Sequence, residues 1–418
     1  MSEDPPAGER TATDRVTAAL RRLDRTEPDV RAWVRVDREG ALSAARERDA
    51  AGSGGVLHGI PVGVKDIIDV RGLHTECGSE LRRGRMAESD APIVARLREL
   101  GAIPLGKTVT TEFAYFFPGP TRNPHNFAHT PGGSSSGSAA AVAAGVVPLA
   151  LGSQTAGSLT RPAAFCGVAG FVAPAGGPLD TTGFQGLAPS LDAVGLLTPA
   201  VAGLRLAYAA LAGDERLAEP AEPPARPRFA VWSGAELTPV AAAMGAALAW
   251  TAEHAAGHGA DLVTVDLAGR TPRLVDAHLT IMAYEAARTL AAEGARPDRL
   301  STQLNELLAN GRGIPDADYR LALSVAEQER VRILALLTDV DAILGPATPG
   351  PAPKGLASTG SPILSRPWHL LGLPALTVPG HRDAGGMPLG LQLIGHPDQL
   401  DRLFALGHAV EEAIRVEH

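Results

Sequence analysis

The stretch from residue 131 to residue 170 constrains this chain more than any other part of its sequence. It holds two turns rich in glycine and serine, at residues 132–137 and 155–158. Between them, small and apolar residues predict a helix over 139–144 and a strand over 146–151. Glycine lets backbone N–H groups approach a ligand closely, and serine supplies a hydroxyl. The two turns together predict a serine nucleophile beside an oxyanion hole.

The two turns resemble the signature of the amidase signature family, a group of serine hydrolases that use a Ser–Ser–Lys triad. In that family a GGSS turn and a G(G/S)S turn place their serines 24 residues apart, and here 158 − 134 = 24. The resemblance implies that Ser158 is the nucleophile. It also implies that Ser134 is the bridging serine, which in the family follows a non-proline cis peptide bond.

The resemblance also supplies a base, which the turns themselves lack. Residues 58–66, HGIPVGVKD, match the family's HGIPxxVKD-like segment, which makes Lys65 the expected base. A free lysine has a pKa of about 10.4, so Lys65 has to be buried to lose its proton near neutral pH. The apolar strand expected over 60–64 predicts such burial. The candidates for the oxyanion hole are the backbone amides of Thr155, Ala156, Gly157 and Ser158.

Several residues depart from the family pattern. Gln154 stands where aspartate is common, and Ala156 replaces the first glycine of the second turn. If the position of Ala156 needs a positive φ, alanine adds strain of about 1 kcal/mol. Thr160 moves Arg161 one residue later than usual, whereas Asp192 matches the aspartate of the family's SLDxxGP segment. These departures remove no member of the triad, but they leave open the alternative that the enzyme is weakened or repurposed.

Two other motifs suggest different functions. Residues 101–108 match the phosphate-binding pattern G-x-x-x-x-G-K-[ST] with Lys107, but the expected strand falls inside the motif and Pro104 lacks a donor N–H. Residues 133–137 match the nucleophile elbow G-x-S-x-G with Ser135 at its centre. That elbow needs a strand directly upstream, and the preceding residues lack the pattern of one. We therefore expect neither a nucleotide site nor an α/β-hydrolase elbow.

Helical and strand patterns alternate along the chain, which favours an α/β fold. Asp90 is the expected N-cap of the third helix. The resemblance implies a single domain over 14–416, with a mixed central β-sheet covered on both faces by helices, after a disordered N-terminus at 1–13. Its core signature is 131–170, and its variable, mostly helical substrate region is 229–340. The patterns predict helices at 14–24, 39–51, 90–100, 201–212 and 400–416, and strands at 33–36, 60–64, 102–105, 341–346, 372–379 and 389–394.

Composition limits the kinds of partner. The 418 residues carry a net charge of −8 and the arginines are scattered, which argues against a nucleic-acid-binding surface. Apolar residues make up 45% and aromatic residues only 4%, so the core has to be aliphatic. The chain has two cysteines, a polar N-terminus and no apolar run long enough to cross a membrane. We expect a cytoplasmic protein without disulfides.

The sequence offers few candidate substrate contacts. Tyr319 and Arg320, in the variable region, could bind a substrate carboxylate, with surface packing as the alternative role. The resemblance places Trp368 near the pocket, where it could equally serve in packing. The histidines lack metal-ligand spacing, so we expect no metal and no cofactor.

The predicted function is hydrolysis of a small-molecule amide to a carboxylate and ammonia or an amine. One alternative is an amide-transfer role, either as a glutaminase-like subunit that feeds ammonia to a partner or as an acyltransferase. Another is a binding protein that keeps the fold without catalysis. The sequence identifies neither the acyl group nor the leaving amine. It also leaves the oligomeric state open, with a homodimer as one alternative.

Overall fold

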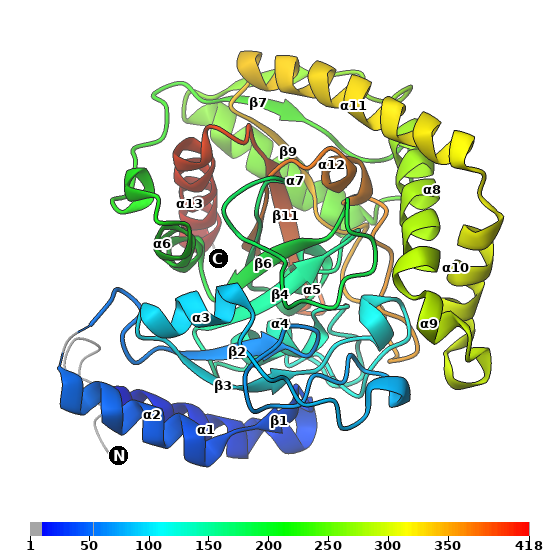
Figure 1. Cartoon of the computed structure of the whole chain (residues 1–418). Helices are drawn as coiled ribbons and strands as arrows, with labels where there is room; N and C mark the ends of the chain where they lie inside the picture. Colours follow the sequence, from blue (N-terminus) through cyan, green and yellow to red (C-terminus); the bar gives the residue numbers. More distant parts are fainter. Residues whose placement is uncertain (1–10, 53, 418) are drawn as a thin grey trace.

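The computed structural model describes residues 11–52 and 54–417, and within them eleven strands form one mixed sheet (Figure 1). In sheet order they are β1 (Trp33–Val36), β3 (Ile103–Thr108), β2 (Pro61–Lys65), β4 (Leu149–Gln154), β6 (Ala193–Thr198), β5 (Ala169–Val172), β10 (Ala375–Arg382), β11 (Pro388–Ile394), β9 (Ala342–Pro346), β7 (Arg228–Val231) and β8 (Asp261–Thr264). β2 pairs in parallel with β3 and β4, and β7 pairs in parallel with β8 and β9. The other neighbours are antiparallel.

Helices cover both faces of this sheet, as the contacts of two successive side chains of β10 show. The side chain of Leu376 lies against Gly407 of α13 (Leu400–Glu417). The next residue, Thr377, lies against Gly390, which also meets Ala164 of α5 (Thr160–Cys166). Successive side chains on a strand point to opposite faces, so α13 and α5 lie on opposite sides of the sheet. This confirms the expected α/β architecture.

The remaining helices complete these layers. α8 packs against both α10 and α11 at the side of the sheet, at the right and top of Figure 1. The bounds are α1 (Ala12–Val30), α2 (Arg38–Ala51), α3 (Pro92–Glu99), α4 (Ser136–Ala143), α6 (Val201–Ala212), α7 (Ala242–Gly257), α8 (Thr271–Thr289), α9 (Ala291–Gly294), α10 (Thr302–Gly313), α11 (Asp316–Asp339) and α12 (Arg366–Leu370).

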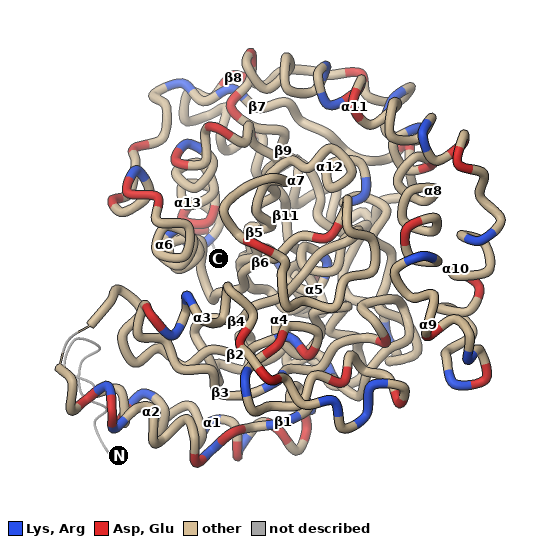
Figure 2. The backbone as a smooth tube through the Cα atoms, in the orientation of Figure 1, with Lys and Arg blue, Asp and Glu red and all other residues tan. Residues whose placement is uncertain are grey.

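The core is aliphatic and rich in alanine, as the composition predicts. One aromatic group lies between β5, α6 and α13, where the ring of Phe171 is 5.0 Å from that of Tyr208 and 4.8 Å from that of Phe404. Most charged residues lie on the outer helices and loops (Figure 2). The centre of the sheet is therefore a low-dielectric environment in which any buried charge is costly.

Several predicted elements match the structure closely, and the stretch 131–170 matches with shifted boundaries. Residues 33–36 and 201–212 form the expected strand and helix. α4 begins at Ser136, earlier than expected, and β4 begins only at Leu149. Gly145 has a φ of +68° and Pro148 has no backbone N–H, so the chain turns there before the strand begins.

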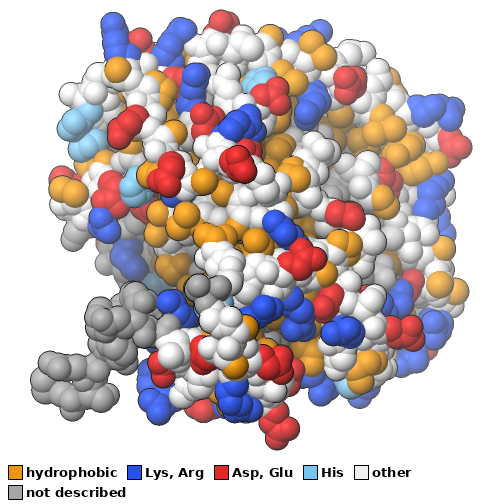
Figure 3. Space-filling view, turned by 60° about the vertical axis from the view of Figure 1, so that its left-hand side comes forward, with side chains coloured by type: hydrophobic (Ala, Val, Ile, Leu, Met, Phe, Trp, Pro, Cys, Tyr) orange, Lys and Arg blue, Asp and Glu red, His pale blue; other side chains and the backbone are white. Residues whose placement is uncertain are grey.

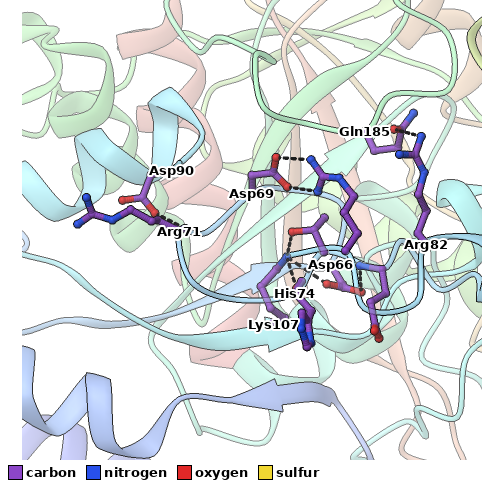
Figure 4. Close-up of polar contacts among 11 residues, drawn as sticks. Asp66, Asp69, Arg71, His74, Arg82, Asp90, Lys107 and Gln185 are labelled. Atoms are coloured by element: carbon purple, nitrogen blue, oxygen red, sulfur yellow. Dashed lines mark hydrogen bonds and ion pairs between the residues drawn. The ribbon is translucent and has the colours of Figure 1, made fainter. Parts of the chain in front are cut away.

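The expected N-cap of the third helix is wrong. The N-cap of α3 is Ala91. The carboxylate of Asp90 instead accepts hydrogen bonds from Arg98 Nε (3.0 Å) and from Arg71 N (2.8 Å), and Figure 4 draws the contact with Arg71. The expected disorder of residues 1–13 is not tested over residues 1–10, which lie outside the described residues. Residues 11–13 are ordered, since Thr11 caps α1 through a reciprocal pair of hydrogen bonds with Asp14.

Residues 229–340 are mostly helical, and they also supply β7 and β8 at one edge of the sheet. The proline-rich segment just before them runs along the surface. Its residues Pro223, Pro224 and Pro227 line an apolar pocket of about 850 Å³ with Trp250 of α7 and Val410 of α13. Figure 3 views the side of the molecule that carries α6 and α13, where hydrophobic side chains lie between charged ones. Among the described helices, none has the length and apolar character needed to cross a membrane.

The buried carboxylate of Glu411, on α13, contacts the start of α6 and makes the stability of the fold depend on pH. Its carboxylate accepts a hydrogen bond from Val201 N (3.0 Å), and burial raises the pKa of Glu411 to about 7. A glutamate in the unfolded chain titrates near pH ~4.3, so the stability that this group contributes is present at low pH and is lost as the pH rises through about 7.

We expect Glu411→Gln, which keeps an accepting oxygen, to raise the midpoint of thermal unfolding more at pH 8 than at pH 5. Differential scanning calorimetry at the two pH values measures this, with the exposed Glu327→Gln as the matched control. A Glu411→Gln protein that unfolds at a lower temperature than the parent at pH 8 would contradict the assigned burial cost.

Candidate active site

Lys65 is the last residue of β2, a strand flanked by β3 and β4. Its side chain is fully buried, and its Nζ is hydrogen-bonded to Ser134 Oγ (2.6 Å) and Ser153 Oγ (2.7 Å). Burial lowers the pKa of Lys65 well below that of a lysine in water; the charge of Asp192 opposes this shift and that of Arg161 adds to it. The surroundings therefore favour the uncharged amine.

Ser134 and Ser158 belong to the two glycine-rich turns, which contact one another. The Gly133–Ser134 peptide bond is cis, as the resemblance implies, and Ser135 N donates a hydrogen bond to Ser158 O (3.1 Å). The side chains of Ser134 and Ser158 line one pocket, called the inner pocket below, with about 310 Å³ of empty volume. Lys65 lies behind Ser134, so Ser134 stands between the buried amine and this pocket.

The second turn leaves its backbone N–H groups available to a ligand. Within the described residues, none of the N–H groups of residues 155–158 donates a hydrogen bond, although these residues are buried. Buried N–H groups are normally paired, so a ligand or water is expected to meet them. Gly157 is needed for close packing, because a Cβ there would lie 2.8 Å from Pro362 Cβ. Ala156 is not among the described residues with positive φ, so the strain considered for alanine is absent.

Two side chains from distant parts of the chain hold this turn. His278 of α8 is fully buried, with its Nε2 2.7 Å from Thr155 O and its Nδ1 2.6 Å from a guanidinium nitrogen of Arg366 in α12. A carbonyl only accepts and a guanidinium only donates, so the imidazole is neutral with its proton on Nε2. Burial lowers the pKa of His278 well below its usual value, in agreement with this assignment.

Gln154 and Arg161, two of the departures from the family pattern, both have partners. Gln154 Oε1 accepts hydrogen bonds from the backbone N–H groups of residues 159 and 160, at 3.0 and 3.1 Å, and so caps the start of α5. Arg161 is buried, which lowers its pKa to about 9, and it donates to Gly133 O (3.1 Å) and Gly360 O (2.8 Å). Arg161 therefore ties the first turn to the loop around residue 360.

Asp192 supports the second turn from the edge of β6. Its carboxylate accepts hydrogen bonds from Thr155 Oγ1 (2.5 Å), Leu187 N (2.8 Å) and Ala188 N (3.0 Å). Burial outweighs these bonds and raises the pKa of Asp192 to about 7. Its charge, which favours the protonated form of Lys65, thus develops near neutral pH.

The residues of the two competing motifs have other surroundings. Lys107 forms an ion pair with Asp66 (3.0 Å) and donates to Thr75 Oγ1 (2.7 Å), and Figure 4 draws these contacts. β3 occupies residues 103–108 of the 101–108 motif, so no phosphate-binding loop forms there. No strand precedes Ser135 within residues 121–135, all of which are described, so the elbow geometry is absent as expected.

The predicted substrate contacts lie outside the lining of the inner pocket. Tyr319 Oη donates to Glu285 Oε1 (2.8 Å), and Arg320 is exposed on α11. Trp368 is fully buried and packs edge-to-face on Trp232, with ring centroids 4.9 Å apart. Contact of these three residues with a substrate stays a prediction.

Four residues of the site were not predicted. Ser153 lies inside the stretch 131–170, and its position as a polar residue in an apolar strand could have revealed it. His278 and Arg366 belong to no motif, so only the fold brings them to the turn. Thr359 lines the inner pocket, and its buried Oγ1 has no hydrogen-bond partner among the described residues.

Comparison with known proteins identifies the family of the chain. A family model described as Amidase matches residues 14–403. A glutamyl-tRNA(Gln) amidotransferase subunit of Picosynechococcus sp. is 32% identical, over 97% of this chain and 96% of its own length. The corresponding protein of Roseiflexus castenholzii, which carries the same name, is 33% identical, over 97% and 93%.

Solved structures give the same assignment. An amidase crystal structure superposes with a TM-score of 0.87 at 31% identity, covering 97% of this chain and 96% of that chain. The peptide amidase from Stenotrophomonas maltophilia superposes with a TM-score of 0.82 at 28% identity, covering 98% and 95%. The family model spans most of the chain and the relatives exceed 30% identity over nearly all of it, so the chain belongs to the amidase signature family.

Proposed function

We propose that this chain is an amidohydrolase that cleaves a small-molecule amide through an acyl-enzyme on Ser158. One observation carries the proposal: the buried amine of Lys65 lies 2.6 Å from Ser134 Oγ, and Ser134 and Ser158 line the same pocket. An uncharged amine can accept a proton, and a hydroxyl can pass one on. These three groups supply what a serine nucleophile needs at neutral pH.

The proposed reaction begins with attack by Ser158 Oγ on the carbonyl carbon of the amide. As the Oγ–C bond forms, the proton of Ser158 passes to Ser134, whose own proton passes to Lys65. The C–N bond then breaks, and the leaving nitrogen takes up the proton that returns along the same path. Water attacks the resulting ester, and the carboxylate leaves with Ser158 restored.

The negative charge that develops on the carbonyl oxygen needs donors placed in advance. The unpaired N–H groups of residues 155–158 are the candidates, and each such donor is typically worth about 2.7–4 kcal/mol. His278 and Asp192 do not touch the substrate in this scheme. They are positioning residues, because both hold Thr155.

An amide-transfer role is the second candidate, and the names of the relatives favour it. Two proteins named as subunits of glutamyl-tRNA(Gln) amidotransferase are 32% and 33% identical to this chain. In that role the same acyl-enzyme would release ammonia to a partner, or would pass its acyl group to an amine. Formation of a hydroxamate from an amide and added hydroxylamine, at a rate well above hydrolysis, would favour acyl transfer; dependence on a partner protein would favour ammonia delivery.

The first test removes the nucleophile and the base. Ammonia release from a panel of small primary amides should be abolished by Ser158→Ala and reduced about 10²–10⁴-fold by Lys65→Ala. Mass spectrometry of the wild-type protein quenched during turnover should find the acyl group on Ser158. The exposed Lys354→Ala is the matched control. Equal rates in the wild type and in Lys65→Ala would mean that Lys65 is not the base.

The second test uses the charge of Asp192. Activity should rise with pH as Lys65 loses its proton, and a negative charge at Asp192 keeps that proton bound to higher pH. Asp192→Asn keeps the oxygen that accepts the two backbone hydrogen bonds but removes the charge. We expect it to move the acidic limb of the kcat/KM profile to lower pH, by up to about one unit.

The pH profile of the exposed Asp276→Asn, on α8, is the matched control and should follow the wild type. An acidic limb that stays in place in Asp192→Asn, or that moves to higher pH, would disprove this coupling between Asp192 and Lys65.

The third test addresses the hydrogen bond from His278 to Thr155 O. Its loss costs about 1–3 kcal/mol, so His278→Ala should lower kcat by about tenfold or more while KM changes little. Glutamine can both donate and accept, so His278→Gln should recover part of kcat. If His278→Ala raises KM at unchanged kcat, the residue acts in substrate binding rather than in holding the turn.

A further inference from the structure

A larger groove adjoins the inner pocket, between α8 and α10. It has about 930 Å³ of empty volume, three times the 310 Å³ of the inner pocket. Tyr115, Phe116 and Met282 line both spaces, so these three side chains form the passage from one to the other. A substrate too large for the inner pocket would continue into this outer groove.

The chain adopts an unfavourable backbone conformation to place this passage. Phe113 and Ala114, directly before Tyr115, have φ angles of 44° and 59°, a left-handed conformation that L-residues avoid. Glu112 fixes the turn at residues 112–115, since its carboxylate accepts hydrogen bonds from Ser79 Oγ (3.2 Å) and from the backbone N of Ser301 (2.9 Å). Ser301 is the N-cap of α10, so the turn that carries Tyr115 is fastened to the groove's own helix.

Charge distinguishes the outer groove from the inner pocket. Among the residues that line the groove, Glu306 alone is charged, and it forms no ion pair or hydrogen bond within the described residues. The amides of Gln303 and Asn310 lie in the same lining. In the inner pocket the charged lining residue is Arg161. The molecule thus offers a positive group near the reacting amide and a negative one farther out.

Tyr115 lies between these two regions. Burial raises the pKa of its hydroxyl, and the charges of Arg366 and Glu306 act on it in opposite directions. Glu306 is thus close enough to the passage for its charge to act on the Tyr115 hydroxyl. The negative charge of Glu306 in the groove lining favours a ligand whose outer end is positive.

We propose that the substrate extends from Ser158 past Tyr115 into the outer groove, and that its distal end carries an ammonium group held by Glu306. This inference rests on the proposed function, because it concerns the same amide. It names the substrate class as amides of amino-alkyl acids, with the amide carbonyl at Ser158 and the amine beyond the passage. Gln303 and Asn310 would accept further hydrogen bonds from the same ammonium.

The test measures binding without turnover, in the Ser158→Ala background. Calorimetric titration compares three primary amides of equal length: 5-aminopentanamide, hexanamide and the monoamide of adipic acid. We expect 5-aminopentanamide to bind about two- to fivefold more tightly than hexanamide, because Glu306 is exposed and solvent screens its attraction for the ammonium group. The adipic acid monoamide should bind most weakly.

Adding Glu306→Gln should bring the ratio of the first two affinities close to one, and Glu306→Asp should keep part of it. Glu253→Gln, on the far helix α7, is the matched control and should leave the ratio unchanged. Equal binding of 5-aminopentanamide and hexanamide, no binding of any of the three, or a preference that survives Glu306→Gln would overturn the proposal.

Failure of the proposed function would appear separately. The wild-type protein would then bind 5-aminopentanamide in preference to hexanamide, with the preference dependent on Glu306, yet release no ammonia from either. Ammonia release from short amides together with equal binding of the three long ones would instead leave the amidohydrolase and remove only the outer site.

Discussion

The burial of an uncharged lysine amine is the constraint on which the site depends. Lys65 and Lys107 are both fully buried, on the neighbouring strands β2 and β3. Lys107 has a carboxylate partner, Asp66, at 3.0 Å, whereas the hydrogen-bond partners of Lys65 are the hydroxyls of Ser134 and Ser153. Burying an unpaired charge is costly, so a lysine among hydroxyls is driven toward its neutral form. One sheet thus holds a structural lysine, Lys107, and a candidate base, Lys65. The difference is the partner, which is a carboxylate for Lys107 and hydroxyls for Lys65.

The small residues of the stretch 131–170 follow from the same constraint. The turn of Ser134 has to lie against the end of β2, and α4, which follows it, has to pack closely on the sheet. A Cβ on Gly137 would lie 2.2 Å from Ala32 O, and a Cβ on Gly152 would lie 2.5 Å from Leu159 Cδ1. Ala139, Ala140 and Ala141 are fully buried. Larger side chains would push the first turn away from Lys65, so the small residues are a packing requirement rather than a sign of flexibility.

The sequence alone pointed to the parts of the candidate site that lie in local motifs. Lys65, Ser134 and Ser158 were named from motifs, and the structure brings Lys65 to Ser134 and both serines to one pocket. What the sequence could not provide were contacts between distant segments. His278 lies 123 residues from Thr155 and carries no motif, so a buried face of an ordinary helix was the only indication. Two local expectations failed because other contacts replaced the expected ones. Asp90 accepts hydrogen bonds from Arg71 and Arg98 instead of capping α3, and β4 begins only after Pro148, which has no backbone N–H to donate.

The helix α8 connects the outer groove to the turn that carries Ser158. His278 and Met282 are four residues apart and therefore lie on the same face of this helix. His278 holds the carbonyl of Thr155, while Met282 lines both the inner pocket and the outer groove. A ligand in the groove therefore contacts the same helix face that positions the turn of Ser158. A substitution on this face of α8 can therefore alter the groove without disturbing the turn only if it leaves His278 in place.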